Sequence, residues 1–344
     1  MPFQIVRNDI TQMQVDAIVN TANPQPLIGS GTDAKVHAKA GAKLLAARQK
    51  IGAICRGDAA ITPGFDLHAK YVIHTVGPVW VDGNQGEEPL LRSCYDNALK
   101  LALEHNCQSV AFPLISTGNY GFPKDKALQI AIAAFSAFLI AQEMQIYLVV
   151  YDSTSFKLSE KLFHRVASYI DDNLVQKSDF FAEKRELPSL PPPAKRQAKE
   201  IRAQGERVPA MRQADICQPP RGRDLDSFLK KKDAGFIETL KELIQKQGLK
   251  NATVYKRANM SKQHFSKLIN SPNANPNKPT AIALALALEL DLRQTQDLIG
   301  RAGFTLTNSS VFDLIIQYYI EQKNYNIIEI NITLYEFDQI LLGS

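Results

Sequence analysis

The sequence has few cysteines, and they are not spaced like a bridged or metal-bound set. Four cysteines occur among 344 residues, and no two form a Cys-x-x-Cys pair. Secreted disulfide frameworks and zinc sites both need paired thiols. The sequence therefore favours a cytoplasmic protein with reduced thiols, no metal centre and no disulfide framework.

The sequence also lacks a long apolar run and a leader-like start. The longest apolar run, residues 130–141, is shorter than the about 20 residues that span a bilayer. The first seven residues contain no basic region followed by an apolar core, so a signal peptide is not expected. We therefore expect no membrane partner.

An excess of positive charge is confined to one segment. The chain has a net charge of +5, and residues 183–223 alone contain ten Lys/Arg and five Asp/Glu. The same segment is rich in proline and poor in apolar residues, as extended or disordered linkers are. We therefore divide the chain into a domain at 1–172, a basic Pro-rich linker at 173–224 and a second domain at 225–344.

Strand and helix patterns alternate from residue 1 to about 170. Short apolar runs end at Gly, Pro or Asn, and segments with apolar residues at helical spacing follow them. This alternation predicts an α/β fold, with a mostly parallel or mixed sheet and helices on both faces. Strands are expected at 3–6, 16–20, 59–61, 71–76, 109–115 and 146–150, and helices at 33–50, 88–104, 124–142 and 155–170.

Polar loops follow three of the expected strands, at 20–23, 116–121 and 151–152. Ligands bind outside the carboxyl ends of strands in such sheets, so we expect the three loops on one rim. Two glycine-containing loops lead into helices, whose first N–H groups are a site for phosphate. Two facing loops of this kind suit a diphosphate.

Three side chains near the first loop are not needed by a pure phosphate cradle. They are the amides of Asn20 and Asn23 and the carboxyl group of Asp33. Asparagine also caps turns and aspartate also caps helices, so these structural explanations stay open. His37 is interpreted as an ordinary helix histidine. The working hypothesis is a phosphate-bearing ligand with chemistry, or close recognition, at one end.

Four segments together resemble the macro domain family, and within it the MacroD-type ADP-ribosyl hydrolases. They read DAIVNTAN at 16–23, GSGTD at 29–33, VIHTVGP at 72–78 and ISTGNYGFP at 115–123. The resemblance covers residues 1 to about 170. It implies an α/β/α sandwich with a mixed sheet, in agreement with the alternation of strands and helices.

The resemblance implies ADP-ribose as the ligand. Asp9 would bond the adenine amino group, Tyr151 would stack on adenine, and the loops 29–32 and 116–120 would hold the diphosphate and distal ribose. Asn23 would hold the distal ribose and Asp33 would activate or orient the attacking water, which makes these two the catalytic candidates. The ligand-binding candidates are Asp9, Ile10, Asn20, Gly29, Ser30, Gly31, Thr32, Ser116, Thr117, Gly118, Asn119, Tyr120 and Tyr151.

The sequence departs from the family pattern at a few positions. Asn8 replaces a usual glycine, Thr21 replaces a usual alanine, and Ser30 and Thr32 interrupt a loop that is commonly Gly-Gly-Gly-Val. Ser30 adds a side chain where the backbone would approach the ribose, which puts substrate preference or rate in question. A Cys/His cluster like that of the zinc-containing branch is missing from the sequence. Neither a metal nor a cofactor is therefore expected, and ADP-ribose would be the ligand or product.

Beyond residue 224 the pattern changes to short helices. The spacing of 254–258, 261–269 and the apolar helix after them resembles a Cro/repressor-type helix-turn-helix domain. This resemblance implies that the helix after Ser261 enters the major groove of DNA, with Lys262, Gln263, His264 and Lys267 facing it. The segment carries none of the basic excess, so a helical protein-interaction or substrate-docking module is an equal alternative. The helices are expected at 236–247, 251–258, 261–269, 281–290, 292–302, 311–321 and 327–342.

The predicted fold class is thus α/β, a macro-domain sandwich followed by a basic linker and an all-α helix-turn-helix-like domain. The predicted function is an ADP-ribosyl hydrolase, which removes ADP-ribose from acidic side chains or deacetylates O-acetyl-ADP-ribose. Its partner would be an ADP-ribosylated protein or an ADP-ribose-derived small molecule. The alternatives are a reader that binds ADP-ribose without turnover, and a regulator whose DNA or protein binding responds to ADP-ribose.

Overall fold

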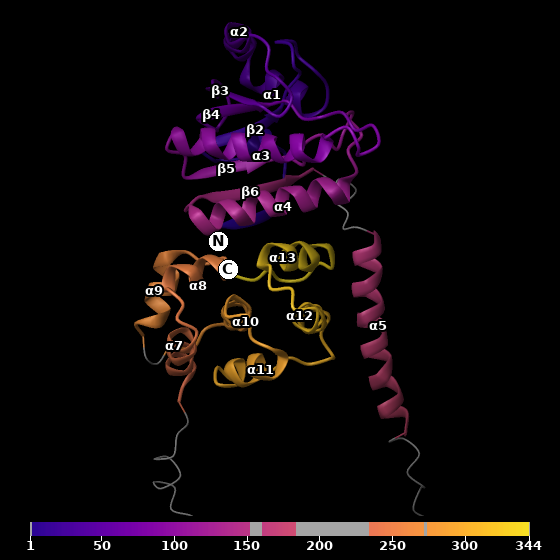
Figure 1. Cartoon of the computed structure of the whole chain (residues 1–344), viewed down its shortest axis with the longest axis vertical. Helices are drawn as coiled ribbons and strands as arrows, with labels where there is room; N and C mark the ends of the chain where they lie inside the picture. The colour runs from indigo at the N-terminus through magenta and orange to yellow at the C-terminus, as the bar shows by residue number, and fades with distance from the viewer. Residues whose placement is uncertain (1, 152–159, 184–233, 272–273, 344) are drawn as a thin grey trace, which may run out of the picture. The chain divides into compact units, whose positions relative to one another are not determined.

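The computed structural model describes residues 2–151, 160–183, 234–271 and 274–343 (Figure 1). Two compact units divide the chain, Met1–Leu174 together with Gly235–Ser344, and Val175–Ala234. The first unit therefore contains both the sheet and the helices that follow residue 235. Most of the predicted basic linker lies outside the described residues, and the predicted division into domains stays a prediction.

A six-stranded sheet forms the centre of the first half, in the order β1-β6-β5-β2-β4-β3. Every neighbouring pair is parallel except β3 and β4, which are antiparallel. The sheet is therefore mixed, as the alternation of strands and helices predicts. The strands are β1 (Phe3–Arg7), β2 (Ala17–Thr21), β3 (Ala59–Pro63), β4 (Tyr71–Thr75), β5 (Ser109–Phe112) and β6 (Gln145–Val150).

Helices cover both faces of this sheet (Figure 1). Successive residues of a strand point to opposite faces, so neighbours in β2 enter different cores. Ile18 packs in one core with Val36 and Leu44, whereas Val19 belongs to the other core with Leu91 and Phe135. The helices are α1 (Thr32–Ala40) and α2 (Ala42–Ile51) on one face, and α3 (Glu87–Glu104) and α4 (Lys124–Ala141) on the other, with a short 3₁₀ helix η1 (Ile10–Gln12) and a later helix α5 (Glu160–Glu183).

One expected helix is wrong, because the segment 33–50 is not continuous. It breaks at Gly41, which separates α1 from α2 and has a φ of 79°. Residues other than glycine rarely adopt this left-handed backbone conformation. A Cβ at Gly41 would also lie 2.7 Å from Oδ2 of Asp66. The break allows α2 to run in a new direction, and Arg48 on α2 contacts the loop after β2.

The helices of the second half begin close to their expected positions. Side-chain caps mark several of these starts: Ser261 accepts a hydrogen bond from the N–H of His264, and Asn277 accepts one from Thr280. The last helix is shorter than expected, since it ends at Glu336 rather than near 342. The helices are α7 (Phe236–Lys246), α8 (Asn251–Arg257), α9 (Lys262–Ile269), α10 (Lys278–Ala287), α11 (Leu292–Gly300), α12 (Val311–Glu321) and α13 (Ile327–Glu336). The region is therefore helical, and its likeness to repressor domains stays a prediction.

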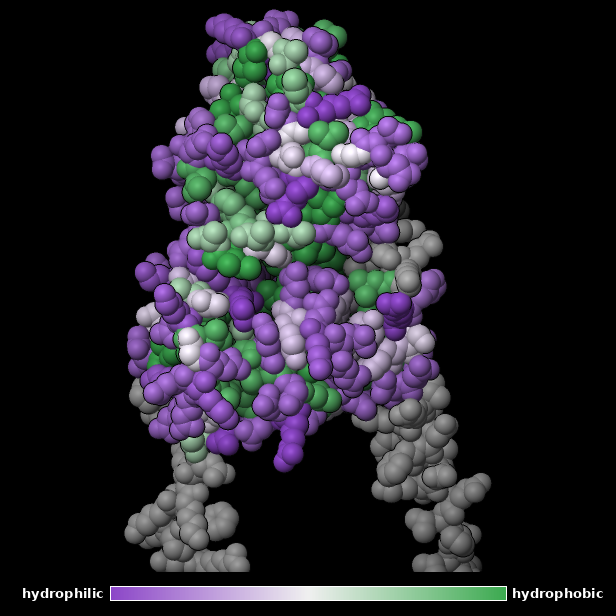
Figure 2. Space-filling view, viewed as in Figure 1, coloured by the Kyte–Doolittle hydropathy of each residue, from purple (hydrophilic) through white to green (hydrophobic). Residues whose placement is uncertain are grey.

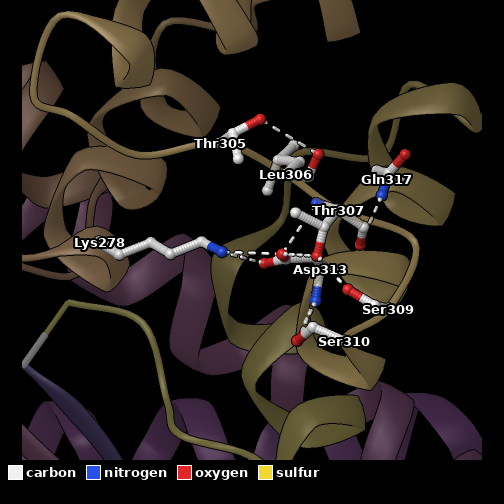
Figure 3. A network of polar contacts seen from close by, with 8 residues as sticks. All are labelled: Lys278, Thr305, Leu306, Thr307, Ser309, Ser310, Asp313 and Gln317. Atoms are coloured by element: carbon white, nitrogen blue, oxygen red, sulfur yellow. Dashed lines mark hydrogen bonds and ion pairs between the residues drawn. The ribbon is translucent and has the colours of Figure 1, made fainter. Parts of the chain in front are cut away.

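A buried ion pair joins α10 to α12 (Figure 3). Lys278 Nζ lies 2.6 Å from Oδ1 of Asp313, whose side chain is 1% exposed. Oδ2 of Asp313 also accepts hydrogen bonds from the N–H and the hydroxyl group of Thr307. The carboxylate therefore holds the loop between α11 and α12 against α10.

The turn between α8 and α9 contacts the edge of the sheet. Oδ1 of Asn259 accepts the N–H of Phe3 at 2.9 Å, and its Nδ2 donates to the carbonyl oxygen of Phe3 at 3.1 Å. On α8, the Tyr255 hydroxyl group donates to Glu143, and Lys256 donates to carbonyl oxygens at the end of α4. Because β1 is an edge strand, Asn259 pairs main-chain groups that would otherwise be left open.

No helix in the described part of the chain is long and apolar enough to cross a membrane. On the face drawn in Figure 2, hydrophilic residues are widely spread and apolar residues gather in patches between them. The predicted cytoplasmic location stays a prediction.

Candidate functional site

A cavity of about 480 Å³ lies at the carboxyl ends of the central strands. It is lined by residues that follow β2, β4, β5 and β6, including Asn23, Ser116 and Tyr151. The expectation that these three loops share one rim is therefore confirmed. The lining residues are Thr21, Ala22, Asn23, Gly29, Ser30, Gly31, Thr32, Asp33, Gly77, Pro113, Leu114, Ser116, Thr117, Gly118, Asn119, Tyr120, Lys124, Val149, Val150 and Tyr151.

Most of the predicted site residues belong to this lining, but three do not. Asp9, Ile10 and Asn20 are not among the lining residues. Asp9 caps η1, where its Oδ1 accepts the N–H and the hydroxyl group of Thr11. Ile10 and Asn20 are buried. Direct contact of these three residues with a ligand stays a prediction.

Asp33 lies in the first turn of α1 and is only 2% exposed. It is not the N-cap, which is Gly31, so the helix-cap explanation for Asp33 is wrong. Its Oδ1 accepts a hydrogen bond from Nδ2 of Asn20 at 2.6 Å, and its Oδ2 accepts the N–H of Gly29 at 2.5 Å. The carboxylate therefore lies at the base of the pocket, held by one donor from β2 and one from the glycine loop.

A chain of buried hydrogen bonds fixes Asn20 beneath the pocket. Nδ2 of Asn20 lies 3.3 Å from Nδ1 of His74, and Nε2 of His74 lies 2.9 Å from the Thr62 hydroxyl group. Burial lowers the pKa of His74 to about 3, so its ring is neutral at pH 7. A neutral ring that accepts at Nδ1 carries its proton on Nε2 and donates to Thr62. The chain from Thr62 to Asp33 thus orients the amide of Asn20, with one N–H toward His74 and the other toward the carboxylate.

His37, interpreted from the sequence as an ordinary helix histidine, lies beside Asp33. Its Nε2 is 3.6 Å from Oδ1 of Asp33, and the residue is 6% exposed. Burial lowers the pKa of His37, which favours the neutral ring near pH 7. A neutral imidazole at this position adds no charge to the base of the pocket.

Arg48 supports the loop after β2 from behind, and sequence reasoning does not identify it. The residue is 2% exposed, and its Nη2 donates to the carbonyl oxygens of Asn23 and Pro24 at 3.2 and 3.3 Å. Its Nη1 donates to the carbonyl oxygen of Gly52. Burial lowers the pKa of Arg48, and the charge of Asp33 acts in the opposite direction. The guanidinium group therefore ties the Asn23 loop to the end of α2.

Ser116 has an unusual backbone conformation and a buried hydroxyl group in the lining. Its φ is 65°, and its Oγ has no hydrogen-bond partner within the described residues. Gly77 makes room for it, because a Cβ at that position would lie 1.9 Å from Oγ of Ser116. Buried polar groups are nearly always hydrogen-bonded, so this hydroxyl group is available to a ligand in the cavity.

The loop before α3 forms a wall behind Tyr120. The N–H of Trp80 donates to the carbonyl oxygen of Tyr120 at 2.8 Å. Glu87 anchors this loop by accepting the N–H groups of Val81 and Gln85, among others. Burial alone would raise the pKa of Glu87, but these main-chain donors outweigh it and lower the pKa to about 2. The wall is therefore held by an ionised carboxylate.

Two cations lie in or beside the pocket. Lys124 is part of the lining. Nζ of Lys35 lies 3.6 Å from the ring centroid of Tyr151, which is 61% exposed. A nucleobase that stacks on the Tyr151 ring would use the ring face opposite Lys35 or displace Lys35. Both cations would favour an anionic ligand.

The candidate DNA-contact residues lie on one helix in the second half. Lys262, Gln263, His264 and Lys267 are all exposed on α9.

Within the described residues, no group of three or more His, Cys, Asp or Glu side chains is arranged to hold a metal ion.

Comparison with known proteins places the first half of the chain. A family model described as "Macro domain" matches residues 19–131. The macro domain-containing protein CT2219 of Chlorobaculum tepidum is 51% identical over 146 residues, which are 42% of this chain and 84% of the relative. An O-acetyl-ADP-ribose deacetylase of Escherichia coli K12 is 45% identical over 166 residues, 46% of this chain and 94% of the relative.

Solved structures include a macrodomain of Oceanobacillus iheyensis with ADP, at 37% identity and a TM-score of 0.42, which covers 46% of this chain and 84% of that chain. The sequence relatives are well above 30% identity and are matched over most of their own length. This chain belongs to the macro domain family.

Proposed function

We propose that the pocket binds ADP-ribose and hydrolyses an ester bond to its distal ribose. The observation that carries this proposal is the buried Asp33 carboxylate, held by Asn20 and Gly29 at the base of a cavity lined by two glycine-containing loops. Relatives at about 45% identity are named O-acetyl-ADP-ribose deacetylases. The substrate would be O-acetyl-ADP-ribose or ADP-ribose esterified to an acidic side chain.

The cavity has groups suited to a diphosphate. The N-cap of α1 is Gly31, and no side chain caps this helix, so its first N–H groups face the loop without a side-chain acceptor. Such helix starts bind phosphate through these N–H groups and the helix dipole. Lys124 adds a positive charge to the lining, and the unpaired hydroxyl group of Ser116 adds a donor.

In the proposed reaction, water attacks the ester carbonyl carbon, and the bond between the acyl carbon and the ribose oxygen breaks. The products are ADP-ribose and the free acid. Asn23 would hold the distal ribose, and Asp33 would orient the water, accept its proton and return that proton to the departing ribose oxygen. No metal or cofactor is part of this proposal, and ADP-ribose is the product.

The test is turnover of O-acetyl-ADP-ribose and of a peptide ADP-ribosylated on glutamate by the full-length chain. Asp33→Asn should bind ADP-ribose in calorimetry and lose most of its turnover, because the amide cannot accept the proton. Asp96→Asn is the matched control, since Asp96 is exposed on α3 away from the lining. Equal product release by Asp33→Asn and the wild type would reject the proposal. Binding of ADP-ribose without turnover of either substrate would favour the reader alternative.

A second candidate function concerns α9. Its exposed face carries Lys262, His264 and Lys267 and lacks acidic residues, which favours contact with phosphate groups. The function would be DNA binding that responds to ADP-ribose. A gel shift of the full-length chain at low and high salt, with and without ADP-ribose, tests it. The double variant Lys262→Gln/Lys267→Gln should reduce the salt dependence, and the absence of binding at low salt would reject it.

A further inference from the structure

Two exposed side chains join the loops on either side of the pocket. Nδ2 of Asn119 donates a hydrogen bond to Oγ of Ser30, 89 positions earlier in the sequence. Ser30 belongs to the loop after β2, and Asn119 belongs to the loop after β5. Both residues line the cavity. The bond therefore connects two loops that the fold brings together only at this edge of the sheet.

The strand order shows where this connection crosses the pocket. β2 and β5 are neighbours in the sheet, with β6 beyond β5 and β4 beyond β2. Tyr151 follows β6 and Gly77 follows β4, and both line the same cavity. The connection between Ser30 and Asn119 thus crosses between the two ends of the cavity.

The exposed fractions show on which side of the cavity the connection lies. Asp33 and Ser116 are 2% and 7% exposed and form the base of the cavity. Ser30 and Asn119 are both exposed, so their hydrogen bond lies on the solvent side. The middle of the cavity is therefore enclosed between a buried base and a side-chain bridge.

We propose that the Ser30–Asn119 hydrogen bond is a strap that retains ligands extending to both sides of it. The identity of the ligand rests on the proposed function. A ligand with groups on both sides can leave only after the strap opens. A shorter ligand, which occupies only the Tyr151 side and the middle, can leave without that step. The pair would therefore determine specificity through the dissociation rate.

One exposed hydrogen bond sets the size of this effect. Its net contribution corresponds to about a fivefold change in a rate constant. Ser30→Ala and Asn119→Ala should each raise the dissociation rate of ADP-ribose by about this factor. The double variant should show no further increase, because both changes remove the same bond. ADP, which has the adenosine diphosphate half and lacks the distal ribose, should dissociate at nearly the wild-type rate from every variant.

Stopped-flow dissociation and calorimetry with the full-length chain measure these effects. Ser30→Thr keeps a hydroxyl group that can accept from Asn119, so ADP-ribose should dissociate from it more slowly than from Ser30→Ala. Gln25→Ala, at an exposed position of the same loop outside the lining, is the control for a general loosening of the loop. Both substituted positions are exposed, so folding should be unaffected, and circular dichroism checks this.

The strap is overturned if the variants raise the dissociation rates of ADP and ADP-ribose equally, or if neither rate changes. It is also overturned if the effects of the two single substitutions add in the double variant. In these cases wild-type binding of ADP-ribose would leave the proposed function in place. If the wild type does not bind ADP-ribose, the proposed function fails and the ligand assignment of the strap fails with it.

Discussion

Arg48 donates a hydrogen bond to the carbonyl oxygen of Asn23 at 3.2 Å, and it does so from a position that is 2% exposed. The same guanidinium group reaches the carbonyl oxygens of Pro24 and Gly52. The residue proposed to hold the distal ribose is thus supported by a buried cation on another helix. A main-chain contact of this kind places Asn23 without limiting its side chain.

Replacement of Arg48 should therefore reduce both stability and activity. Arg48→Gln leaves buried carbonyl oxygens without donors, so the free energy of unfolding should fall by about 2–4 kcal/mol. The loss of kcat should exceed the change in KM if Asn23 acts mainly in the transition state. Urea unfolding and initial rates with O-acetyl-ADP-ribose measure both quantities. Arg92→Gln, which removes an exposed ion pair with Asp96, is the control. Full stability and full kcat in Arg48→Gln would show that the contact does not matter.

The hydrogen bond that the Asp33 carboxylate accepts depends on the orientation of the Asn20 amide. Asn20→Asp would place a second carboxyl group where the amide now donates at 2.6 Å. Two carboxyl groups this close share a proton and titrate as a pair. We expect kcat to fall at neutral pH and the acidic limb of its pH profile to move to higher pH. Asn20→Ala removes one donor without adding a charge, so it should lower kcat and move that limb less than Asn20→Asp does. An unchanged profile in Asn20→Asp would contradict this role of Asn20.

The rim of the pocket could be predicted from the sequence because it depends on local signals. Asn23, Ser116 and Tyr151 each follow a strand, and parallel strands bring their carboxyl ends to one edge. Gly41 is also a local signal, because glycine commonly ends a helix. The apolar spacing on both sides of it nevertheless favours one continuous helix.

The residues that hold the site in place could not be predicted from local signals. Arg48 lies in a helix where arginine is ordinary, and its role depends on contacts with residues 24 and 25 positions earlier. Glu87 resembles any acidic residue at a helix start until its loop folds back onto it. The hydrogen bond between Ser30 and Asn119 spans 89 positions, so the sequence could show both as ligand-binding candidates but not that they bond to each other.

Stability should fall with decreasing pH below about 6.5 because of His74. Burial lowers the pKa of His74 to about 3 in the folded state from 6.5. Between these values the unfolded chain binds a proton that the folded chain does not, so stability is present at higher pH and lost as the pH falls. The slope should be about 1.4 kcal/mol per pH unit for this one group.

The measurement is urea unfolding at several pH values between 7 and 5. This window lies above the titration of Glu87, whose pKa falls from 4.5 to about 2 and whose contribution is lost only at lower pH. The lowered pKa of His37 acts in the same direction as that of His74. His74→Asn should therefore reduce the slope without abolishing it. An equal slope in His74→Asn and the wild type would exclude His74 as a source.

The ion pair between Lys278 and Asp313 should matter for stability mainly because removal of Lys278 leaves the buried Asp313 carboxylate without its cation. Asp313 is 1% exposed, and Lys278 lies 2.6 Å from it (Figure 3). Lys278→Met leaves a buried carboxylate without its cation, which typically costs about 3–5 kcal/mol. The double variant Lys278→Met/Asp313→Leu should recover part of the loss. Urea unfolding checks this, and a double variant less stable than Lys278→Met would contradict it. Lys262→Met on the exposed face of α9 is the control.

Asn259 should connect the stability of the second half to that of the sheet. Its side chain pairs both main-chain groups of Phe3 in the edge strand β1. Asn259 has a φ of 53°, so Asn259→Gly removes the amide without straining the backbone. The free energy of unfolding should fall by about 1–3 kcal/mol, because two buried groups lose their partner.

Hydrogen exchange of the full-length chain gives the sharper measurement. The N–H of Phe3 donates to Oδ1 of Asn259, so its protection should fall in Asn259→Gly while the N–H groups of β2 and β4 keep theirs. Asn270→Gly, at an exposed position after α9, should leave Phe3 unchanged. If the N–H of Phe3 exchanges equally fast in Asn259→Gly and the wild type, the turn between α8 and α9 does not stabilise the edge of the sheet. Tyr255, Lys256 and Asn326 would still join the helices of the second half to α4.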